Sequence, residues 1–189
     1  MMQDRNELVS VIIPTFGRCE YLERTIGSVL LQTYTNIEVI VVDDNGKGSS
    51  QGIKTAKLMT AFSGDSRVRY IQHDRNINGS AARNTGISAA RGIYVAFLDD
   101  DDEFSQDKIS LQVNKLEQSK GVSAVYCFNS KYYNGKMIQK TTYSKDGNCQ
   151  FDVFCLKSEI HTSSLLVSKD VLNELGGFDA DFLRHQDFE

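Results

Sequence analysis

Five consecutive acidic residues, Asp99 to Glu103, are the part of this 189-residue sequence with the clearest capacity for chemistry. They directly follow an apolar run, residues 93–98, whose β-branched and aromatic side chains are typical of a strand buried on both faces. Two carboxylates about 4 Å apart repel by roughly 1 kcal/mol in water and about 4 kcal/mol near a protein surface. A divalent cation would remove this repulsion, and hard oxygen ligands select Mg²⁺, Mn²⁺ or Ca²⁺. The alternative is a solvated acidic loop that only keeps the chain soluble.

A second acidic pair, Asp43 and Asp44, follows another apolar run, residues 37–42. Ligands of open α/β sheets bind outside the carboxyl ends of the strands, and acids there contact sugar hydroxyls or a base N–H of a nucleotide. The pair therefore predicts ligand contact by at least one carboxylate. A turn-forming Asx motif is the alternative.

Two further segments offer weaker signals of the same kind. Pro14, Thr15 and Phe16 end the first apolar run and would give backbone groups and an aromatic ring to a base, although a plain strand-to-helix turn explains them equally well. Arg83 lies one turn into an Ala-rich helical segment, where free N–H groups attract anions and a guanidinium matches phosphate oxygens. An exposed Arg paired with a nearby acid is the alternative. Neither a P-loop nor a GxGxxG motif is present.

Late in the chain, Asp187 and Glu189 lie beside His185. Taken alone, such late carboxylates are expected to be surface residues. His161 is likewise expected to be structural and not a metal ligand.

The elements that must position these groups alternate between strands and helices, which predicts a mostly parallel sheet flanked by helices. Pro14 should end the first strand, because proline cannot donate to a ladder. Asn134-Gly135 predicts a two-residue turn inside an antiparallel hairpin, residues 129–145. Strands are expected at 8–13, 37–42, 68–72, 93–98, 122–128 and 164–167, and helices at 20–32, 49–62, 80–90, 106–119 and 169–175.

The composition is that of one ordinary globular domain, with 40% hydrophobic and 24% charged residues. A formal net charge of −4 with scattered Lys and Arg argues against a nucleic-acid partner. The first ten residues lack a signal-peptide pattern, and no apolar stretch reaches the roughly 18 residues of a membrane span. Four irregularly spaced cysteines are expected to be free thiols in a reducing cytoplasm.

Four segments in this order resemble the inverting family 2 glycosyltransferases with the GT-A fold: VSVIIPTFGR, NIEVIVVDDN, HDRNINGSAARNTGISAARGIYVAFLDDDDEF, and GGFDADF with the later HQDFE. The resemblance covers nearly the whole chain. It implies an α/β GT-A domain over residues 1–189, with a Rossmann-like, mostly parallel sheet and a small antiparallel hairpin. Residues 1–102 would be the nucleotide-binding half, and residues 103–189 an acceptor-side half that is truncated at its C-terminus.

On the nucleotide side, the resemblance implies that Pro14, Thr15 and Phe16 form the first nucleotide-contacting turn. Asp44 matches the acid that reads the pyrimidine base, with Asp43 beside it.

At the reacting end, the resemblance implies that Arg83 lies near the diphosphate and that Asp99 and Asp101 are the two acids of the DxD motif. Asp101 would be the direct ligand of Mn²⁺ or Mg²⁺, and Asp100 would contact the ribose. Asp187 matches the catalytic acid of the late ED-type motif and would act as general base.

The implied activity is metal-dependent transfer of a sugar from a nucleotide-diphosphate sugar, a UDP-sugar in the first instance, to an acceptor hydroxyl. The acceptor would be a carbohydrate or a lipid-linked or protein-linked group in surface polysaccharide or glycoconjugate synthesis. The expected location is the cytoplasm, with peripheral association at the inner face of the membrane; the oligomeric state is left open. The chain has Gln186 where the ED motif has its first acid, and it has no QxxRW, which favours single-sugar transfer. The alternatives are an inactive sugar-nucleotide-binding module and, more remotely, a receiver-like signalling domain.

Overall fold

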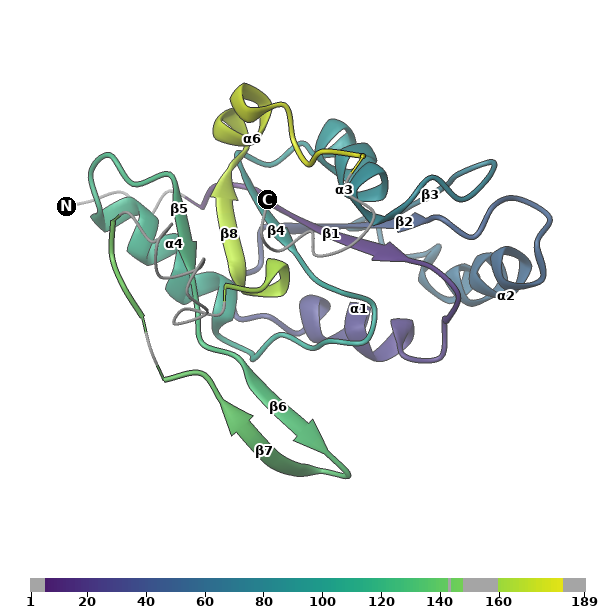
Figure 1. Ribbon diagram of the computed structural model, residues 1–189, viewed down its shortest axis with the longest axis horizontal. Helices are drawn as coiled ribbons and strands as arrows, with labels where there is room; N and C mark the ends of the chain where they lie inside the picture. Colours follow the sequence, from purple (N-terminus) through teal and green to yellow (C-terminus); the bar gives the residue numbers. More distant parts are fainter. Residues whose placement is uncertain (1–5, 143, 148–159, 182–189) are drawn as a thin grey trace.

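The computed structural model describes residues 6–142, 144–147 and 160–181, and these form a sheet with helices on both faces (Figure 1). The central sheet has six strands in the order β3-β2-β1-β4-β8-β5. Strands β1 to β4 pair with one another in parallel. β8 is antiparallel to both of its neighbours, so β5 runs in the same direction as β4. The strands are β1 (Val9–Thr15), β2 (Ile37–Asp43), β3 (Val68–Gln72), β4 (Tyr94–Phe97), β5 (Ala124–Tyr126) and β8 (Leu165–Ser168).

The helices cover the two faces of this sheet unequally. One face packs against α1, α2 and α4, and the other packs against α3 and α6. Alternate residues of β1 divide between the two cores: Val11 faces the first and Ile12 the second, and both are fully buried. The helices are α1 (Leu22–Leu30), α2 (Ser50–Met59), α3 (Gly79–Ala89), α4 (Lys108–Gln118) and α6 (Lys169–Leu175), with short 3-10 turns η1 (Thr60–Phe62) and η2 (Thr162–Ser164).

The predicted sheet, its helical flanks and the hairpin are confirmed, with shifts of a few residues at element ends. The strand expected at 122–128 is shorter, and the helix expected at 49–62 ends in a 3-10 turn. The hairpin consists of β6 (Ser130–Tyr133) and β7 (Lys136–Lys140), joined by Asn134 at φ 49° and Gly135 at φ 74°. Two consecutive positive φ angles are what a two-residue hairpin turn requires.

Pro14 does not end the first strand, and that prediction is wrong. β1 continues to Thr15, with Pro14 opposite Val42 of β2. The pairing of β1 with β4 stops at Ile12. Because N–H groups alternate between the two sides of a strand, and Val9 donates towards β2, the missing N–H of Pro14 faces the side that β4 has already left. No ladder bond is lost.

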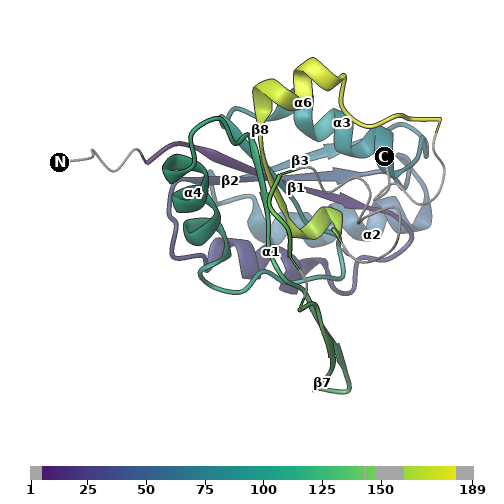
Figure 2. The same cartoon turned by 60° about the vertical axis from the view of Figure 1, so that its left-hand side comes forward.

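Figure 2 shows the β6–β7 hairpin extending away from the body of the molecule. Within the described parts of the chain, no helix has the length and apolar character to cross a membrane.

Candidate active site

The parallel strands bring three of the predicted segments to one edge of the sheet. Thr15, Asp43 and the acid run after β4 all lie at strand carboxyl ends. Thr15 links the other two segments: its hydroxyl donates to Asp100 Oδ2 at 2.7 Å, and its carbonyl accepts from the backbone N–H of Asp44 at 2.9 Å. The predicted convergence of these segments is therefore observed in the fold, as parallel strand ends require.

The acid run is held in place by residues before and within α1. The Thr25 hydroxyl donates to the carbonyls of Asp100 and Asp102 at 3.0 and 2.9 Å. Arg24 donates to the carbonyl of Asp101 at 3.2 Å and pairs with Glu103 at 3.0 Å. The run is thus a fixed turn and not a freely solvated loop.

The carboxylates of the run differ in burial and in partners. Asp100 is 4% exposed and accepts from Thr15 and from Arg18 Nε at 3.0 Å. Arg18 also pairs with Asp101, across 3.0 Å, and the Asp101 side chain is 41% exposed. Burial raises the pKa of Asp100, and the Thr15 and Arg18 hydrogen bonds offset only part of this effect. Although Asp102 as a residue is exposed, protein packed around its carboxyl and the charges of Asp99 and Asp101 raise its pKa too.

These carboxylates suit a cation whose remaining coordination positions are filled by a substrate. All the donors are hard oxygens, and a cation would offset the repulsion that neighbouring carboxylates exert on Asp100 and Asp102. Among the described residues, no group of three or more His, Cys, Asp or Glu side chains is arranged to enclose a metal ion. Mg²⁺ is commonly held by one or two carboxylates together with substrate phosphates, and Asp99 and Asp101, whose side chains are 40% and 41% exposed, offer accessible carboxylates for such a site.

Arg83 lies on α3 and points at the acid run. Its Nη2 donates to Asp99 Oδ1 at 2.8 Å, and the residue is 7% exposed. The guanidinium also lies 5.6 Å from the centre of the Phe178 ring, which in turn packs edge-on against Phe97 at 5.2 Å. The predicted Arg is therefore oriented by a carboxylate on one side and an aromatic ring on the other.

The carboxylate of Asp43 is fully buried, and both of its oxygens have protein partners. One oxygen accepts from the backbone and side chain of Asn45 at 2.8 and 2.7 Å. The other accepts from the Tyr70 hydroxyl and from Gln72. Burial and the hydrogen bond to Asp43 raise the pKa of Tyr70, which keeps that hydroxyl a donor. In this structure Asp43 therefore orders the loop after β2.

Asp44 is 2% exposed, and both of its carboxylate oxygens bond residues of the loop between β3 and α3. Oδ1 lies 2.8 Å from His73 Nδ1 and accepts from the Ile77 N–H at 2.9 Å. Oδ2 accepts from Asn76 Nδ2 at 2.7 Å and from the Asn78 N–H at 2.9 Å. Sequence reasoning expected a ligand-reading carboxylate, and the structure places both oxygens on internal donors. What Asp44 fixes directly is the position of the α3 N-terminus.

Asn78 shows how firmly this terminus is fixed. It adopts φ 85°, which is uncommon for a residue other than glycine, and its side chain caps α3 by accepting from Ala81 N at 3.0 Å. Its amide also donates to the Ala180 carbonyl at 2.8 Å. Strained backbone of this kind persists only where surrounding contacts determine it.

Asn84 is a site residue that the sequence analysis missed. Its Nδ2 donates to the Phe178 carbonyl at 2.7 Å, and its Oδ1 accepts from the Phe178 N–H at 2.8 Å. This reciprocal pair, here called the Asn84 clamp, fixes the chain after α6 against α3. In the sequence, Asn84 directly follows Arg83, and Gly177 is the second of two glycines after the helix expected at 169–175, but neither position alone predicts the pairing. A Cβ on Gly177 would lie 2.4 Å from Asn84 Oδ1, so the close approach requires glycine.

Of the remaining predicted residues, Pro14 is half-buried and Phe16 is 58% exposed beside the site edge. Gly17 N donates to Asn45 Oδ1 at 2.7 Å, which ties this turn to the loop after β2. Asp187 and Gln186 lie outside the described residues.

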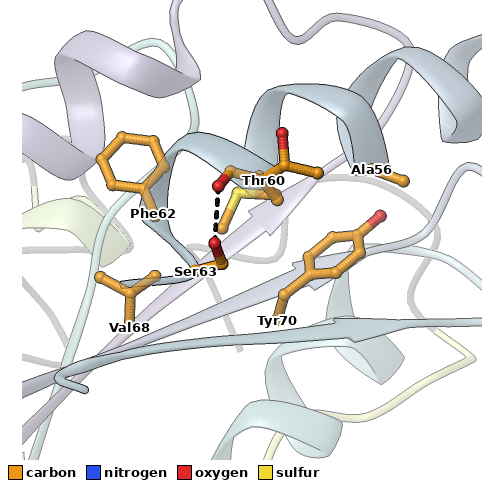
Figure 3. Close-up of a pocket in the computed structure, with 7 residues that line it drawn as sticks. Ala56, Thr60, Phe62, Ser63, Val68 and Tyr70 are labelled. Atoms are coloured by element: carbon orange, nitrogen blue, oxygen red, sulfur yellow. Dashed lines mark hydrogen bonds between the residues drawn. The ribbon is translucent and has the colours of Figure 1, made fainter. Parts of the chain in front are cut away.

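An apolar hollow of about 320 Å³ lies elsewhere, between the end of α2 and the edge strand β3 (Figure 3). None of the predicted site residues lines it. Its connection to the site is Tyr70, whose ring borders the hollow while its hydroxyl bonds Asp43.

Comparison with known proteins gives consistent matches. The family model described as Glycosyl transferase family 2 matches residues 10–176. The amylovoran biosynthesis glycosyltransferase AmsB of Erwinia amylovora is 28% identical over 190 residues, covering 95% of this chain and 61% of AmsB. The chain spans 21%, 21% and 19% of the length of three Rickettsia proteins named as uncharacterized glycosyltransferases, which it matches at 36–39% identity.

Two solved structures share the fold. TarS 1–349 from S. aureus, in complex with UDP, superposes with a TM-score of 0.74 at 18% identity, covering 96% of this chain and 53% of that one. The mannosyltransferase PcManGT from Pyrobaculum calidifontis, in complex with GDP-Man and Mn²⁺, gives a TM-score of 0.69 at 20% identity, covering 93% and 48%.

Proposed function

The chain belongs to glycosyl transferase family 2, and we propose that it transfers a sugar from a nucleotide-diphosphate sugar to an acceptor hydroxyl with inversion at the anomeric carbon. The observation that carries the proposal is the acid run at the carboxyl edge of the sheet, flanked by Arg18 and Arg83. That arrangement offers oxygen ligands for a cation and guanidinium groups for phosphate within one connected network.

The diphosphate would be stabilised by charge on both sides of the acid run. Arg83 and Arg18 are each paired with a run carboxylate, across 2.8 and 2.9 Å. A planar guanidinium matches phosphate oxygens, and charge placed where negative charge develops lowers the barrier to departure of the diphosphate. A Mn²⁺ or Mg²⁺ ion held by Asp101 would supply Lewis-acid stabilisation of the same leaving group.

Asp187 is proposed as the general base that removes the acceptor proton. Proton transfer to a positioned group typically contributes about 10² to 10⁴-fold in rate. The described residues that precede Asp187 in the chain, 177–181, are held along α3 by the Asn84 clamp and by the Asn78 contact to Ala180. The proposed roles of Asp43 and Asp44 are to hold the loops around the nucleotide, because their carboxylates already bond protein donors.

The proposed donor is a UDP-sugar, which would meet Pro14, Thr15 and Phe16 through its base and Asp100 through its ribose. TarS was solved with UDP and PcManGT with GDP-Man, so the shared fold accommodates either nucleotide. The name of AmsB connects that relative with amylovoran biosynthesis, which supports a proposed role in polysaccharide or glycoconjugate synthesis for this chain, in the cytoplasm beside the membrane.

A thermal-shift panel of UDP- and GDP-sugars, each with and without Mn²⁺, tests the donor and the metal together, because a ligand that binds the native state raises its melting temperature. We expect a UDP-sugar to raise the melting temperature in a Mn²⁺-dependent way. Asp101→Asn should abolish the Mn²⁺-dependent part, and the matched control Glu103→Gln should retain it, since Glu103 pairs with Arg24 on the outer side of the run. A shift that is independent of Mn²⁺ in all three proteins would remove the metal from the proposal.

A non-catalytic sugar-nucleotide-binding module is the second candidate, and Gln186 in place of the first acid of the late motif favours it. Asp187→Asn distinguishes the two. If the chain is a transferase, the variant binds the donor as tightly as wild type and loses sugar transfer and donor hydrolysis. If wild type binds the donor and neither transfers nor hydrolyses it, the binding module is the correct assignment. Family membership leaves no support for the receiver-like alternative.

A further inference from the structure

The hairpin formed by β6 and β7, here called the ribbon (residues 130–140), is exposed along both strands. Its large apolar side chains are open to solvent, with exposed fractions of 62% for Tyr132, 69% for Tyr133, 53% for Met137 and 65% for Ile138. A two-stranded hairpin alone in water is marginally stable, and clustered exposed apolar side chains mark interaction surfaces. The ribbon therefore has the character of a surface that a partner covers.

The charge of the ribbon indicates what kind of partner this is. Lys131, Lys136 and Lys140 lie on it, and residues 129–142 contain no Asp or Glu. The whole chain has a formal net charge of −4, so the ribbon is a basic and aromatic projection from an acidic protein. Its partner should be negatively charged and should accept apolar side chains.

The register of the hairpin distributes both properties over both faces. Tyr132 pairs with Met137, and Tyr133 pairs with Lys136. Because successive residues of a strand point to opposite faces, each face carries one tyrosine. A flat protein surface would cover only one face, whereas a lipid headgroup layer can surround both. Lysines on exposed strands also oppose edge-to-edge pairing with a second copy of the ribbon.

The ribbon leaves the molecule from the same edge of the sheet as the candidate active site. β5 runs in the direction of β4, so its carboxyl end lies at the edge that carries the acid run, and the ribbon begins shortly after Tyr126. Its base is closed by the Tyr126 hydroxyl, which accepts from Lys145 N at 2.7 Å, and by the bond from Thr141 N to the Asn129 carbonyl at 2.9 Å. Figures 1 and 2 agree in showing the ribbon as a projection beyond the helices.

We propose that the ribbon docks the protein on an anionic lipid bilayer, with the tyrosines, Met137 and Ile138 at headgroup depth and the lysines on acidic headgroups. Tyrosine is favoured at membrane interfaces, lysine stems extend along apolar surface, and basic side chains are attracted by anionic lipid. The inference deepens the proposed function, on which its purpose rests: docking would bring the acid-run edge to acceptors at the membrane surface.

Flotation with vesicles made of equal parts phosphatidylglycerol and phosphatidylcholine tests the proposal on the 189-residue chain. Each lysine near an anionic surface strengthens binding by about fivefold, so replacing the three ribbon lysines with Gln should weaken binding by about 100-fold. The matched control replaces three exposed lysines outside the ribbon, Lys54, Lys57 and Lys120, with Gln, which changes the net charge equally. Tyr132→Ser with Tyr133→Ser should also weaken binding, and vesicles of phosphatidylcholine alone should bind little of any variant.

The measurements on these variants distinguish docking on lipid from a general charge effect and from pairing with a second copy. Equal loss in the ribbon and control lysine variants would show a general charge effect and overturn the proposal, as would absence of wild-type binding to the anionic vesicles. A wild-type dimer in sedimentation that the tyrosine variant abolishes, without vesicle binding, would assign the ribbon to a second copy instead. UDP-sugar binding measured without vesicles should be unchanged in every ribbon variant. A wild-type chain that binds vesicles and no sugar nucleotide would keep the ribbon proposal and refute the proposed function.

Discussion

Gly177→Ala tests whether the Asn84 clamp holds the chain after α6. Gly177 has φ +77°, and a Cβ there would lie 2.4 Å from Asn84 Oδ1. An L-residue in this backbone conformation costs about 1 to 2 kcal/mol. Displacing Asn84 breaks its hydrogen bonds of 2.7 and 2.8 Å to the Phe178 backbone, at about 1 kcal/mol each. The free energy of unfolding should therefore fall by about 3 to 4 kcal/mol, the sum of these two contributions.

The chain supplies its own control in the neighbouring glycine. Gly176 has φ +81°, and nothing lies within 4 Å of the position its Cβ would take. Gly176→Ala should therefore cost only the backbone part, about 1 to 2 kcal/mol. In an Asn84→Ala background the clash is absent, so Gly177→Ala should cost no more than Gly176→Ala. This coupling is what a double-mutant cycle measures.

Urea unfolding followed by circular dichroism gives the free energies, and titration with the donor gives the functional consequence. Because Phe178 lies against the Arg83 guanidinium, releasing the clamp should also weaken binding of the sugar nucleotide. Equal destabilisation by the two glycine substitutions, or an unchanged cost of Gly177→Ala when Asn84 is alanine, would refute the clamp.

Three further changes test buried charges. Glu38→Gln should lower the free energy of unfolding by about 2 kcal/mol at pH 7, below the roughly 3 to 5 kcal/mol of a fully buried pair, because its partners Arg91 and Arg69 both reach solvent. Burial acts to raise the pKa of Glu38, but hydrogen bonds from Ser10 and Arg91 outweigh it, so the pKa lies below the usual 4.5. The difference in unfolding free energy between wild type and variant should therefore be full above pH 4.5 and decrease as the pH falls further. Denaturation measured at a series of pH values tests this. Asp44→Asn puts an amide against two donors and should cost about 2 to 3 kcal/mol by urea unfolding. Asp74→Asn, which removes only an exposed ion pair with Lys47, should have a much smaller effect. Lys108→Met should stabilise the protein by about 2 kcal/mol at pH 7. Burial lowers the pKa of Lys108 from 10.5 to about 8, which corresponds to about 3 kcal/mol of destabilisation, and losing the contact with the Phe104 ring offsets about 1 kcal/mol of the gain. Between about pH 8 and 10.5 the unfolded state binds more protons than the folded state, so the gain should shrink as pH rises through this range.

The sheet was predictable because its strands are buried on both faces. All seven residues of β2, Ile37 to Asp43, are buried, and five of them are β-branched apolar residues, which is the pattern that predicted the strand. The wrong prediction at Pro14 came from judging one residue without its neighbours. Whether a proline breaks a strand depends on which side its nitrogen faces and where the adjoining strand stops, and both are properties of the assembled sheet.

The candidate site was predictable in its location and less so in its contacts. Parallel strand ends meet at one edge, so Thr15, Asp44 and Asp99 had to lie near one another. The direction of a carboxylate depends on donors that are distant in sequence. Asp44 bonds Asn76 and its neighbours after β3, and Asn84 bonds Phe178 after α6. No local pattern contains these pairings, because they form only when α3 packs between the two segments.

The acid run also changes the electrostatic reasoning for a metal. Repulsion within the run was expected to require a cation, yet Arg18 and Arg83 already neutralise part of it, through contacts of 2.9 and 2.8 Å. Because both arginines pair with carboxylates of the run, a diphosphate that binds there competes with those carboxylates for the same guanidinium groups. A carboxylate released in this way has a stronger need for a cation than before. Binding of the diphosphate and of the metal should therefore reinforce each other, and the affinity for Mn²⁺ should be measurably higher in the presence of the nucleotide than without it.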